Sequence, residues 1–310
     1  MNRQAPSRAK TIFAFIAIYV IWGSTYLAIR YAIESVPPLL MMGARSFIAG
    51  LILFFWSRLR GNGRIEKEHW RALVIIGASF FLVAHGLLAW AEVRVLSGLA
   101  AVLVASEPLW IVTIESFFLK DARVTKKGIF GLILGFGAIV FLIASTEGIS
   151  SSKGDTIASL AIVFGAISWS GGAVYSRVAK LPESPLLSAG MELMIGGFLL
   201  LIAGVIFGEA HQFSIAEVST RSFLALGYLI ALGSVTAFSS YVWLLGNTSA
   251  TRVSTHTYVN PLIAVLLGWL IADEHLTVEL LIATVFIIIS VFLVLYDQTE
   301  ELSDERMQES

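Results

Sequence analysis

The sequence carries one hydrophobic pattern twice. Residues 22–38 recur as residues 169–185, and residues 90–108 recur as residues 243–261, each copy beginning with Trp and ending with Pro. Each half holds five apolar stretches, and a membrane-spanning helix takes about 20 such residues. Because five is odd, the second half must enter the membrane from the opposite side. Two Trp pairs and two Pro pairs in the same order argue against chance, so we interpret the chain as an inverted repeat.

The composition is typical of a membrane protein. Hydrophobic residues make up 57% of the chain, charged residues make up 14%, and the mean hydropathy is +0.82. An ordinary soluble domain carries about 25% charged residues, so a soluble chain of this composition could not cover its own surface. The chain also lacks cysteine, which excludes disulfides, thiolate metal sites and cysteine nucleophiles.

The predicted fold is all-α, an integral membrane protein of ten transmembrane helices in two inverted five-helix repeats. The predicted spans are residues 12–31, 39–56, 72–90, 96–119, 128–145, 157–176, 186–207, 223–245, 254–271 and 278–296. The first repeat covers residues 1–148 and the second covers residues 149–298, with a polar run at residues 147–155 around the boundary. Residues 299–310 are predicted to form a polar cytoplasmic tail.

The positions of Lys and Arg predict the orientation. Of the 21 Lys and Arg residues, 16 fall in segments that lie inside if the N-terminus is cytoplasmic, 4 fall in outside segments, and Arg45 lies within a span. Cytoplasmic loops carry the excess of positive charge, so we expect both termini in the cytoplasm. The first apolar stretch is too long for the apolar region of a signal peptide, and we expect it to be retained as a helix.

Two charged residues occupy equivalent places within spans. A charge at the bilayer centre costs about 2.5–3.5 kcal/mol on insertion scales, so such residues usually face the bundle interior or water. Arg45 lies in span two and Glu192 in span seven, and subtracting the repeat shift of 147 from 192 gives 45. Each either bonds backbone near a helix end or contacts a substrate, and the sequence leaves both interpretations open.

Further polar residues lie deeper. Glu107 is midway along span four, directly before Pro108, and with a repeat shift of 153 its counterpart is Asn260, directly before Pro261. His85 and His256 lie in spans three and nine. For each histidine, ordinary packing and substrate contact both remain open.

The two prolines are predicted to act as hinges. Each removes a backbone donor and obstructs the carbonyl four residues earlier, and in a membrane the freed groups need a partner or a water-lined cavity. Pro108 and Pro261 stand at matching places in the two halves. Interrupted helices at matching places are a good sequence indicator of a central binding site, although a simple kink without a substrate role remains an alternative.

The sequence shows no catalytic signature. It has no H-E-x-x-H, G-x-S-x-G or phosphate-loop pattern, and its five histidines lack the spacing of metal ligands. We therefore predict that the protein is not an enzyme and holds no metal or cofactor. The expected partners are a small-molecule substrate and the lipid bilayer, with no nucleic acid, and the oligomeric state is left open.

The order and spacing of several motifs resemble the drug/metabolite transporter superfamily, in particular its EamA-type branch with ten helices. The motifs are Trp22-Gly23-Ser24-Thr25-Tyr26, Arg45-Ser46-Phe47-Ile48-Ala49-Gly50, Glu107-Pro108-Leu109-Trp110, Trp169, Asn260-Pro261-Leu262 and Asp273-Glu274-His275-Leu276-Thr277. Lys120-Asp121 is a looser match to the last of these in the first half. The resemblance covers about residues 11–296.

The resemblance implies an exporter of the bacterial inner membrane that works by alternating access between two five-helix halves. In such folds spans one, three, four, six, eight and nine line the central cavity. Carried onto this chain, the expected substrate-binding residues are Trp22, Tyr26, His85, Glu107, Trp169, Trp243, His256 and Asn260. Family substrates include amino acids, other small metabolites and drugs.

We therefore expect a secondary transporter that exports an amino acid-like or drug-like organic metabolite across the plasma membrane. Glu107 is the candidate for a protonatable group that couples transport to the proton gradient, because it lies deep and directly before Pro108. An uncoupled facilitator or channel is the main alternative. An intramembrane enzyme acting on lipids is a weaker one, because it needs a concentrated acid/base or metal constellation.

Overall fold

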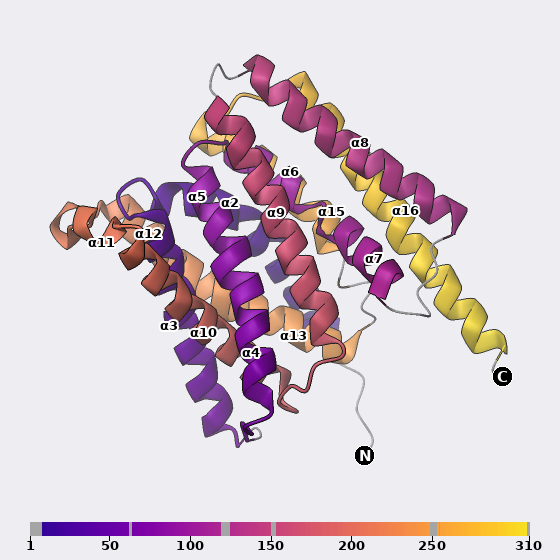
Figure 1. The fold of residues 1–310 in the computed structure, drawn as a ribbon, viewed down its shortest axis with the longest axis horizontal. Coiled ribbons are helices and arrows are strands. Elements are labelled where there is room, and N and C mark those ends of the chain that lie inside the picture. The colour runs from indigo at the N-terminus through magenta and orange to yellow at the C-terminus, as the bar shows by residue number, and fades with distance from the viewer. Residues whose placement is uncertain are drawn as a thin grey trace.

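The computed structural model describes residues 8–61, 64–118, 125–149, 153–248, 253 and 255–308, and it shows only helices within them (Figure 1). The first half consists of α1 (Arg8–Ile16), η1 (Ala17–Ile21) and α2 (Trp22–Ala32) in span one, α3 (Pro38–Leu59) in span two, α4 (His69–Gly77), η2 (Ala78–His85) and α5 (Gly86–Glu92) in span three, α6 (Ser97–Val104) and α7 (Glu107–Phe118) in span four, and α8 (Lys126–Ile149) in span five.

The second half repeats this order. It consists of α9 (Lys153–Ser176) in span six, α10 (Pro185–Ile206) in span seven, α12 (Thr220–Tyr228), η4 (Leu229–Ala237) and α13 (Phe238–Asn247) in span eight, α15 (His256–Ala272) in span nine, and α16 (Val278–Gln308) in span ten. Two short helices, α11 (Glu209–Gln212) and η3 (Ile215–Glu217), lie in the connection between spans seven and eight.

The predicted fold class is confirmed. Nine helices in the described part of the chain are long and apolar enough to cross a membrane, and α15, with 17 residues, is a shorter apolar helix at the place of the ninth span. Ten consecutive spans in two sets of five give two repeats of opposite orientation. Following the predicted orientation, we use the name inner end for the end of the bundle where α1 starts. The opposite end is called the outer end.

Two polar segments are more helical than the sequence suggested. The polar run at residues 147–155 is largely helical, because α8 continues to Ile149 and α9 already begins at Lys153. Asp155 lies in the first turn of α9, where the helix dipole favours a negative charge. The segment predicted as a polar tail continues α16 to Gln308, since residues 299–308 contain no Gly or Pro that would end a helix.

Two pairs of helices hold the halves together at the sides of the bundle. α3 packs against α10, and α8 packs against α16 along its length (Figure 1). Glycines permit the first contact, because a Cβ on Gly50 would clash with the backbone of Met194, and a Cβ on Gly197 would clash with the backbone of Phe47. The remaining spans, one, three, four, six, eight and nine, form the middle of the bundle.

Small residues also bring α8 close to α16. A Cβ on Gly131 would lie 2.9 Å from Val294 Cγ2, which agrees with close packing at the Gly131-x-x-x-Gly135 motif. The second motif of this kind, Gly204-x-x-x-Gly208, is different. Gly204 packs against Leu40, but Gly208 has a φ of +82° with no atom near its Cβ position, so it ends the helix and does not pack.

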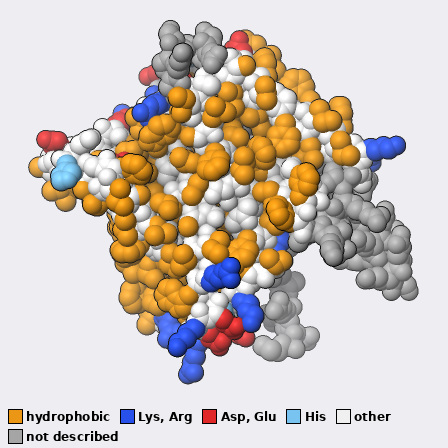
Figure 2. Space-filling model, in the orientation of Figure 1, with side chains coloured by type: hydrophobic (Ala, Val, Ile, Leu, Met, Phe, Trp, Pro, Cys, Tyr) orange, Lys and Arg blue, Asp and Glu red, His pale blue; other side chains and the backbone are white. Residues whose placement is uncertain are grey.

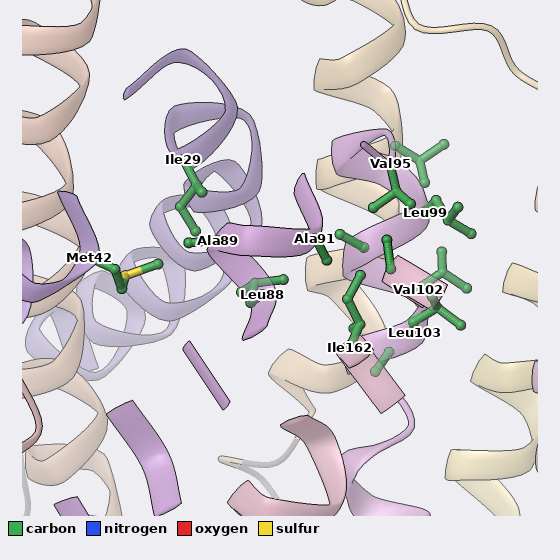
Figure 3. Packing of buried hydrophobic residues seen from close by; sticks show 14 of the residues in the cluster. Ile29, Met42, Leu88, Ala89, Ala91, Val95, Leu99, Val102, Leu103 and Ile162 are labelled. Carbon is green, nitrogen blue, oxygen red and sulfur yellow. The ribbon is translucent and has the colours of Figure 1, made fainter. Parts of the chain in front are cut away.

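The core and the surface are both apolar, as expected in lipid. Figure 3 shows buried side chains from α2, α3, α5, α6 and α9 packed together in the middle of the bundle. Large apolar side chains also cover most of the face in Figure 2, and Lys and Arg gather at one end. The exposed apolar side chains of the molecule include Phe130 and Ile133 on α8 and Val285 on α16, and their exposure fits contact with acyl chains.

Candidate functional site

Three spans contain a π-helical segment. These segments are η1 in span one, η2 in span three and η4 in span eight. Adding the repeat shift of 153 to residues 78–85 gives 231–238, which overlaps residues 229–237 of η4, so η2 and η4 are repeat-equivalent. π-Helical turns are rare and occur frequently at functional sites, because they widen the helix and free backbone carbonyls.

Side chains from the opposite half donate to carbonyls in each π segment. Trp22 Nε1 in the first half donates to the Gly233 carbonyl in η4 at 3.0 Å. Ser168 Oγ in the second half donates to the Ser79 carbonyl in η2 at 3.1 Å. With its amide nitrogen facing the carbonyls, Asn260 donates to Ile18 and other carbonyls at 3.1 Å, which ties span nine to η1. The π segments therefore lie at the interface between the halves.

Two aromatic groups, each built around one of two repeat-equivalent tryptophans, flank this interface. Trp22 lies 5.1 Å from His256 and 5.2 Å from Tyr241 between ring centroids. Trp169, its equivalent in the second half, stacks on His85 at 5.4 Å and on Phe80 at 4.1 Å. Each group joins the two halves, because Trp22 contacts spans eight and nine while Trp169 contacts span three.

Glu107 lies near residues of both aromatic groups. Span four is interrupted at Ala105 and Ser106, and Glu107 is the first residue of α7. The backbone carbonyl of Glu107 accepts from Ser170 Oγ at 3.0 Å, and Ser170 directly follows Trp169 in sequence. The carboxyl group of Glu107 is within electrostatic range of Tyr26 and Tyr241. Among the described residues, no hydrogen bond or ion pair to this carboxyl group is found.

Several predicted residues therefore meet in one region, and one lies at its edge. Contacts join Trp22, His256 and Asn260 in one group and Trp169 and His85 in the other, while Glu107 and Tyr26 are within electrostatic range of each other. Trp243 belongs instead to a hydrophobic cluster around Ala14, Ile18, Leu244 and Val253 towards the inner end, where Trp22 and Tyr241 also pack. Asn260 makes contacts that serve the helix backbone. Whether these residues bind substrate stays a prediction.

The intramembrane charges Arg45 and Glu192 do not pair with each other. Arg45 Nε donates to Ser234 Oγ in η4 at 2.9 Å, and Glu192 accepts from Ser188 Oγ on its own helix at 2.9 Å. Both side chains are buried, 6% and 7% exposed for the whole residues. Arg45 thus binds across the interface, whereas the hydrogen bond of Glu192 stays within α10.

The two prolines differ in their surroundings. Pro108 is the second residue of α7, where its missing N–H removes no helical hydrogen bond. Pro261 lies inside α15, which continues through it without a break. The interruption is therefore present in span four and not at the matching place in span nine. The predicted hinge role of either residue is not tested by this geometry.

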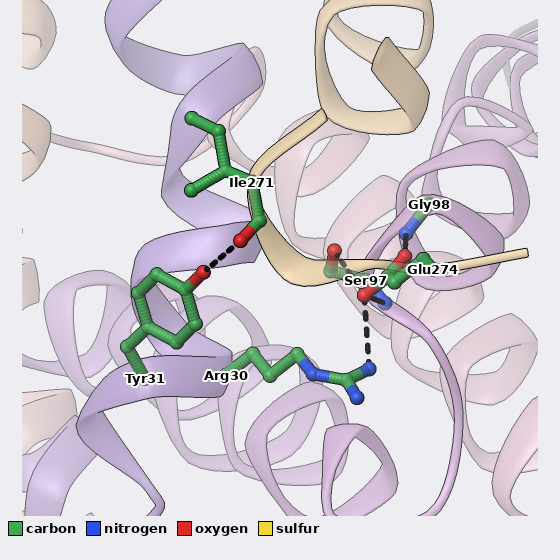
Figure 4. A network of polar contacts seen from close by, with 6 residues as sticks. All are labelled: Arg30, Tyr31, Ser97, Gly98, Ile271 and Glu274. Carbon is green, nitrogen blue, oxygen red and sulfur yellow. Dashed lines mark hydrogen bonds and ion pairs between the residues drawn. The ribbon is translucent and has the colours of Figure 1, made fainter. Parts of the chain in front are cut away.

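The outer end of the interface is closed by polar contacts around Glu274 (Figure 4). Its carboxylate accepts from Arg30 Nη1 at 2.9 Å, from the Ser97 hydroxyl at 2.7 Å, and from the Ser97 and Gly98 backbone N–H groups at 2.9 and 3.1 Å. The anion thereby caps the N-terminus of α6. Nearby, Tyr31 Oη donates to the Ile271 carbonyl at 3.2 Å. Every one of these bonds joins the first half to the second.

The inner end carries two further ion pairs between the halves. Arg177, directly after α9, pairs with Glu115 on α7, and Lys180 Nζ lies 2.7 Å from Glu68 Oε2. Lys180, through its hydrogen bond and its charge, lowers the pKa of Glu68, and Glu68 raises the pKa of Lys180. Arg30 and Arg177 are repeat-equivalent, since 177 minus 147 is 30. Equivalent arginines therefore form cross-half ion pairs at opposite ends.

One group of potential metal ligands lies at the inner surface. Glu66, Glu68 and His69 bring their ligand atoms within 4.8 Å of one another. Glu68 is already paired with Lys180, and the Glu66 N–H donates to His69 Nδ1 at 3.1 Å. The cluster is exposed and acidic, and its contacts within the chain account for its geometry.

The sequence missed three features of the site. The first is the π-helical segments, for which hydrophobic periodicity gives no signal. The second is the set of ion pairs, although the equivalence of Arg30 and Arg177 was visible in the repeat. The third is the environment of Glu92, which lies at the end of α5 with its carboxyl oxygens buried and without a hydrogen-bond partner among the described residues.

Comparison with known proteins agrees with this architecture. The EamA-like transporter family matches residues 9–144 and 156–296. The inner membrane transporter YedA of Escherichia coli K12, which is called uncharacterized, is 35% identical over 265 residues, covering 85% of this chain and 83% of that protein. The uncharacterized transporter YoaV of Bacillus subtilis is 26% identical, covering 92% of this chain and 96% of that protein.

A solved crystal structure shows the same fold. It superposes with a TM-score of 0.65 at 21% sequence identity, covering 94% of this chain and 99% of that one. The resemblance found in the motifs is thus confirmed by the family match across both halves. The chain is a multi-pass membrane protein and belongs to the EamA-like transporter family.

Proposed function

We propose that this transporter exports a small organic metabolite, amino acid-like or drug-like, by alternating access between its two halves. In this proposal, the substrate binds between the Trp22 and Trp169 aromatic groups, next to Glu107. The two tryptophans are repeat-equivalent and each packs against rings of the opposite half, which is the main support for a site at this interface. Aromatic walls with few polar groups are typical of sites for small organic ligands.

The ion pairs at both ends support the alternating part of the proposal. Arg30–Glu274 joins the halves at the outer end, and Arg177–Glu115 joins them at the inner end. For substrate to leave on one side, the pair on that side must separate while the other holds. The predicted location, the bacterial inner membrane with both termini cytoplasmic, places the outer pair toward the periplasm.

Ligand-induced thermal stabilisation of the purified protein tests the site, because a ligand that binds the native state raises its apparent stability. A panel of amino acids and aromatic amines is screened first. For a compound that stabilises the parent protein, we expect Trp22→Ala and Trp169→Ala to lose the stabilisation. Trp70→Ala, which changes an exposed Trp at the start of α4, should keep it. Unchanged stabilisation in both interface variants contradicts the proposed site.

Flux measurements in proteoliposomes test the role of Glu107. With the compound selected by the screen, we expect the parent protein to accumulate substrate against its gradient when a pH gradient is imposed. Glu107→Gln removes the titratable group and should leave only exchange down the substrate gradient. If Glu107→Gln keeps the parent's dependence on the pH gradient, Glu107 is not the coupling group. Flux in the parent that follows only the substrate gradient identifies a facilitator.

A further inference from the structure

Glu92 is a buried acid whose carboxyl group accepts no hydrogen bond from the described residues. It is the last residue of α5, its exposure is 4%, and neither carboxyl oxygen has a hydrogen-bond partner within the described residues. By contrast, Glu274 nearby accepts four hydrogen bonds. An ionised carboxylate without partners is costly to bury, and the proton-bound form avoids much of that cost.

Glu92 also lines a cavity at the outer end. The cavity has a volume of about 360 Å³, and its walls include Arg30, Glu34, Arg94 and Leu96. Glu92 therefore lies where the outer cavity meets the interior of the bundle. Both carboxyl oxygens of Glu92 are buried. A proton is small enough to reach them when the surrounding side chains fluctuate slightly.

The cations around Glu92 are engaged with other groups. Arg30 pairs with Glu274 at 2.9 Å. Arg94 donates to the Trp90 carbonyl at 3.3 Å and stacks over the Trp90 ring.

Arg45 is the cation with the weakest attachment. Its bonds go to the neutral Ser234 hydroxyl, and at 3.6 Å to Met42 Sδ. It is within electrostatic range of Glu92, as are Arg30, Glu274 and Tyr26. A carboxylate is a much stronger acceptor for a guanidinium than a hydroxyl or a thioether.

We propose that Glu92 binds a proton taken up from the outer cavity, and that loss of this proton draws Arg45 from Ser234 toward Glu92. The Arg45–Ser234 hydrogen bond joins α3 of the first half to η4 of the second. Proton occupancy of Glu92 therefore controls a bond between the halves. The role of this switch in transport rests on the proposed function, whereas the protonation itself does not.

Infrared spectroscopy of the purified full-length protein tests the protonation without any substrate. A neutral carboxyl group gives a carbonyl stretching band that disappears when the proton leaves. We expect such a band near neutral pH, its loss as the pH is raised, and its absence in Glu92→Gln. Glu34→Gln, which changes an exposed acid of the same cavity, should retain the band, and so should Glu107→Gln. A band that persists unchanged in Glu92→Gln overturns the proposal.

A second variant keeps the test decisive if Glu92→Gln does not fold. Glu92→Asp retains a carboxyl group, so its band should remain and shift in frequency and in titration midpoint. An unshifted band and midpoint in Glu92→Asp show that another group titrates. Because the result depends only on Glu92, it can fail while transport itself is demonstrated, and the two proposals are separable.

The coupling to Arg45 is measured with a single cysteine, because the chain contains none of its own. Leu96→Cys places a thiol in the outer cavity, and Ile215→Cys places an exposed reference thiol in η3, outside the lining of that cavity. The ratio of their labelling rates by a membrane-impermeant maleimide removes the intrinsic pH dependence of the reagent. We expect the ratio to rise about fivefold as the pH is raised. This is about the change in an equilibrium constant that the loss of one ordinary hydrogen bond produces.

The same ratio should be independent of pH when either Glu92→Gln or Arg45→Met is added. If the ratio still changes with pH in either background, Glu92 does not act through Arg45. If it is already independent of pH in the parent protein, the proton does not control the interface.

Discussion

Glu274 shows how one buried charge can organise an interface. Its four hydrogen bonds fix Arg30 and the start of α6, and the bonds cross from one half to the other. Such a carboxylate is stabilising because both of its oxygens are satisfied. Exposed pairs such as Arg221–Glu34, at 3.4 Å, contribute much less because water competes for both charges.

Truncation of this residue gives the first prediction. Glu274→Ala leaves Arg30 and two backbone N–H groups without their acceptor, so we expect a loss of about 2–4 kcal/mol in the free energy of unfolding. Glu34→Ala, at the exposed pair on the same end, is the matched control and should change little. Unfolding in mixed detergent micelles measures both. Equal effects of the two variants contradict the role assigned to the Glu274 network.

The inner pair Lys180–Glu68 predicts a dependence on pH. The lowered pKa of Glu68 means that its share of the stability is present above the unfolded pKa, about 4.3, and is lost as the pH falls through the folded value. The raised pKa of Lys180 means that its share is present below about 10.4 and is lost as the pH rises through the folded value.

Lys180→Met should therefore lower the melting temperature slightly near neutral pH, with the difference from the parent protein vanishing at acidic pH below the range of Glu68. Arg64→Met, on the same side of the bundle, controls for the loss of a positive charge. If the difference in melting temperature between Lys180→Met and the parent protein stays constant down to the lowest pH at which the protein folds, the Lys180–Glu68 pair is not its cause.

At the scale of elements, the π segments explain why particular side chains sit where they do. Ser168 and Trp22 donate to carbonyls that a regular α-helix would keep for its own ladder. Ser168→Ala should lower the free energy of unfolding by about 1 kcal/mol. Ser176→Ala is the control, because Ser176 bonds Ala173 on its own helix. Equal losses for the two serines contradict the cross-half role of Ser168.

The contact between α3 and α10 gives a steric prediction. A Cβ at Gly197 would clash with the backbone of Phe47, so Gly197→Ala must push the two helices apart. We expect a loss of several kcal/mol or failure to fold, since overpacking of a tight contact costs about 1–3 kcal/mol even where side chains can adjust. Gly137→Ala, which meets nothing within 4 Å, should be tolerated. Similar expression and melting temperature of both variants exclude tight packing at Gly197.

The elements themselves were accessible from the sequence, but their interruptions were not. Ten apolar stretches predicted ten spans, because lipid requires each crossing segment to satisfy its own backbone. The π segments depend on partners from the other half, such as Ser168 for Ser79, and no local pattern records such a partner. The two equivalent prolines show a second limit of the sequence pattern. Span four is interrupted shortly before Pro108, whereas α15 continues through Pro261 without a break.

At the scale of the whole molecule, the repeat determines the arrangement of the site. Trp22 and Trp169 were identified by their equivalence, and the structure places each against the opposite half. Glu92 could not be recognised from its own neighbourhood in the sequence, since what distinguishes it is the absence of a partner among the described residues of other spans. Burial and pairing are properties of the assembled bundle.

The same equivalence extends to the ends of helices. Gly61 and Gly208 both have positive φ, +70° and +82°, and 208 minus 147 is 61. They follow α3 and α10, whose last turns are capped by Arg60 and Phe207. Arg60 and Phe207 are therefore equivalent, exposed positions that the inverted arrangement places on opposite sides of the membrane.

The most direct test of the account is to label these two positions. Arg60→Cys and Phe207→Cys each introduce a single thiol into a chain without cysteine. With a membrane-impermeant maleimide, we predict that Phe207→Cys is labelled in cells whose inner membrane is intact, and that Arg60→Cys is labelled only after that membrane is permeabilised. Labelling of both thiols from the same side contradicts two inverted halves and the transport path between them.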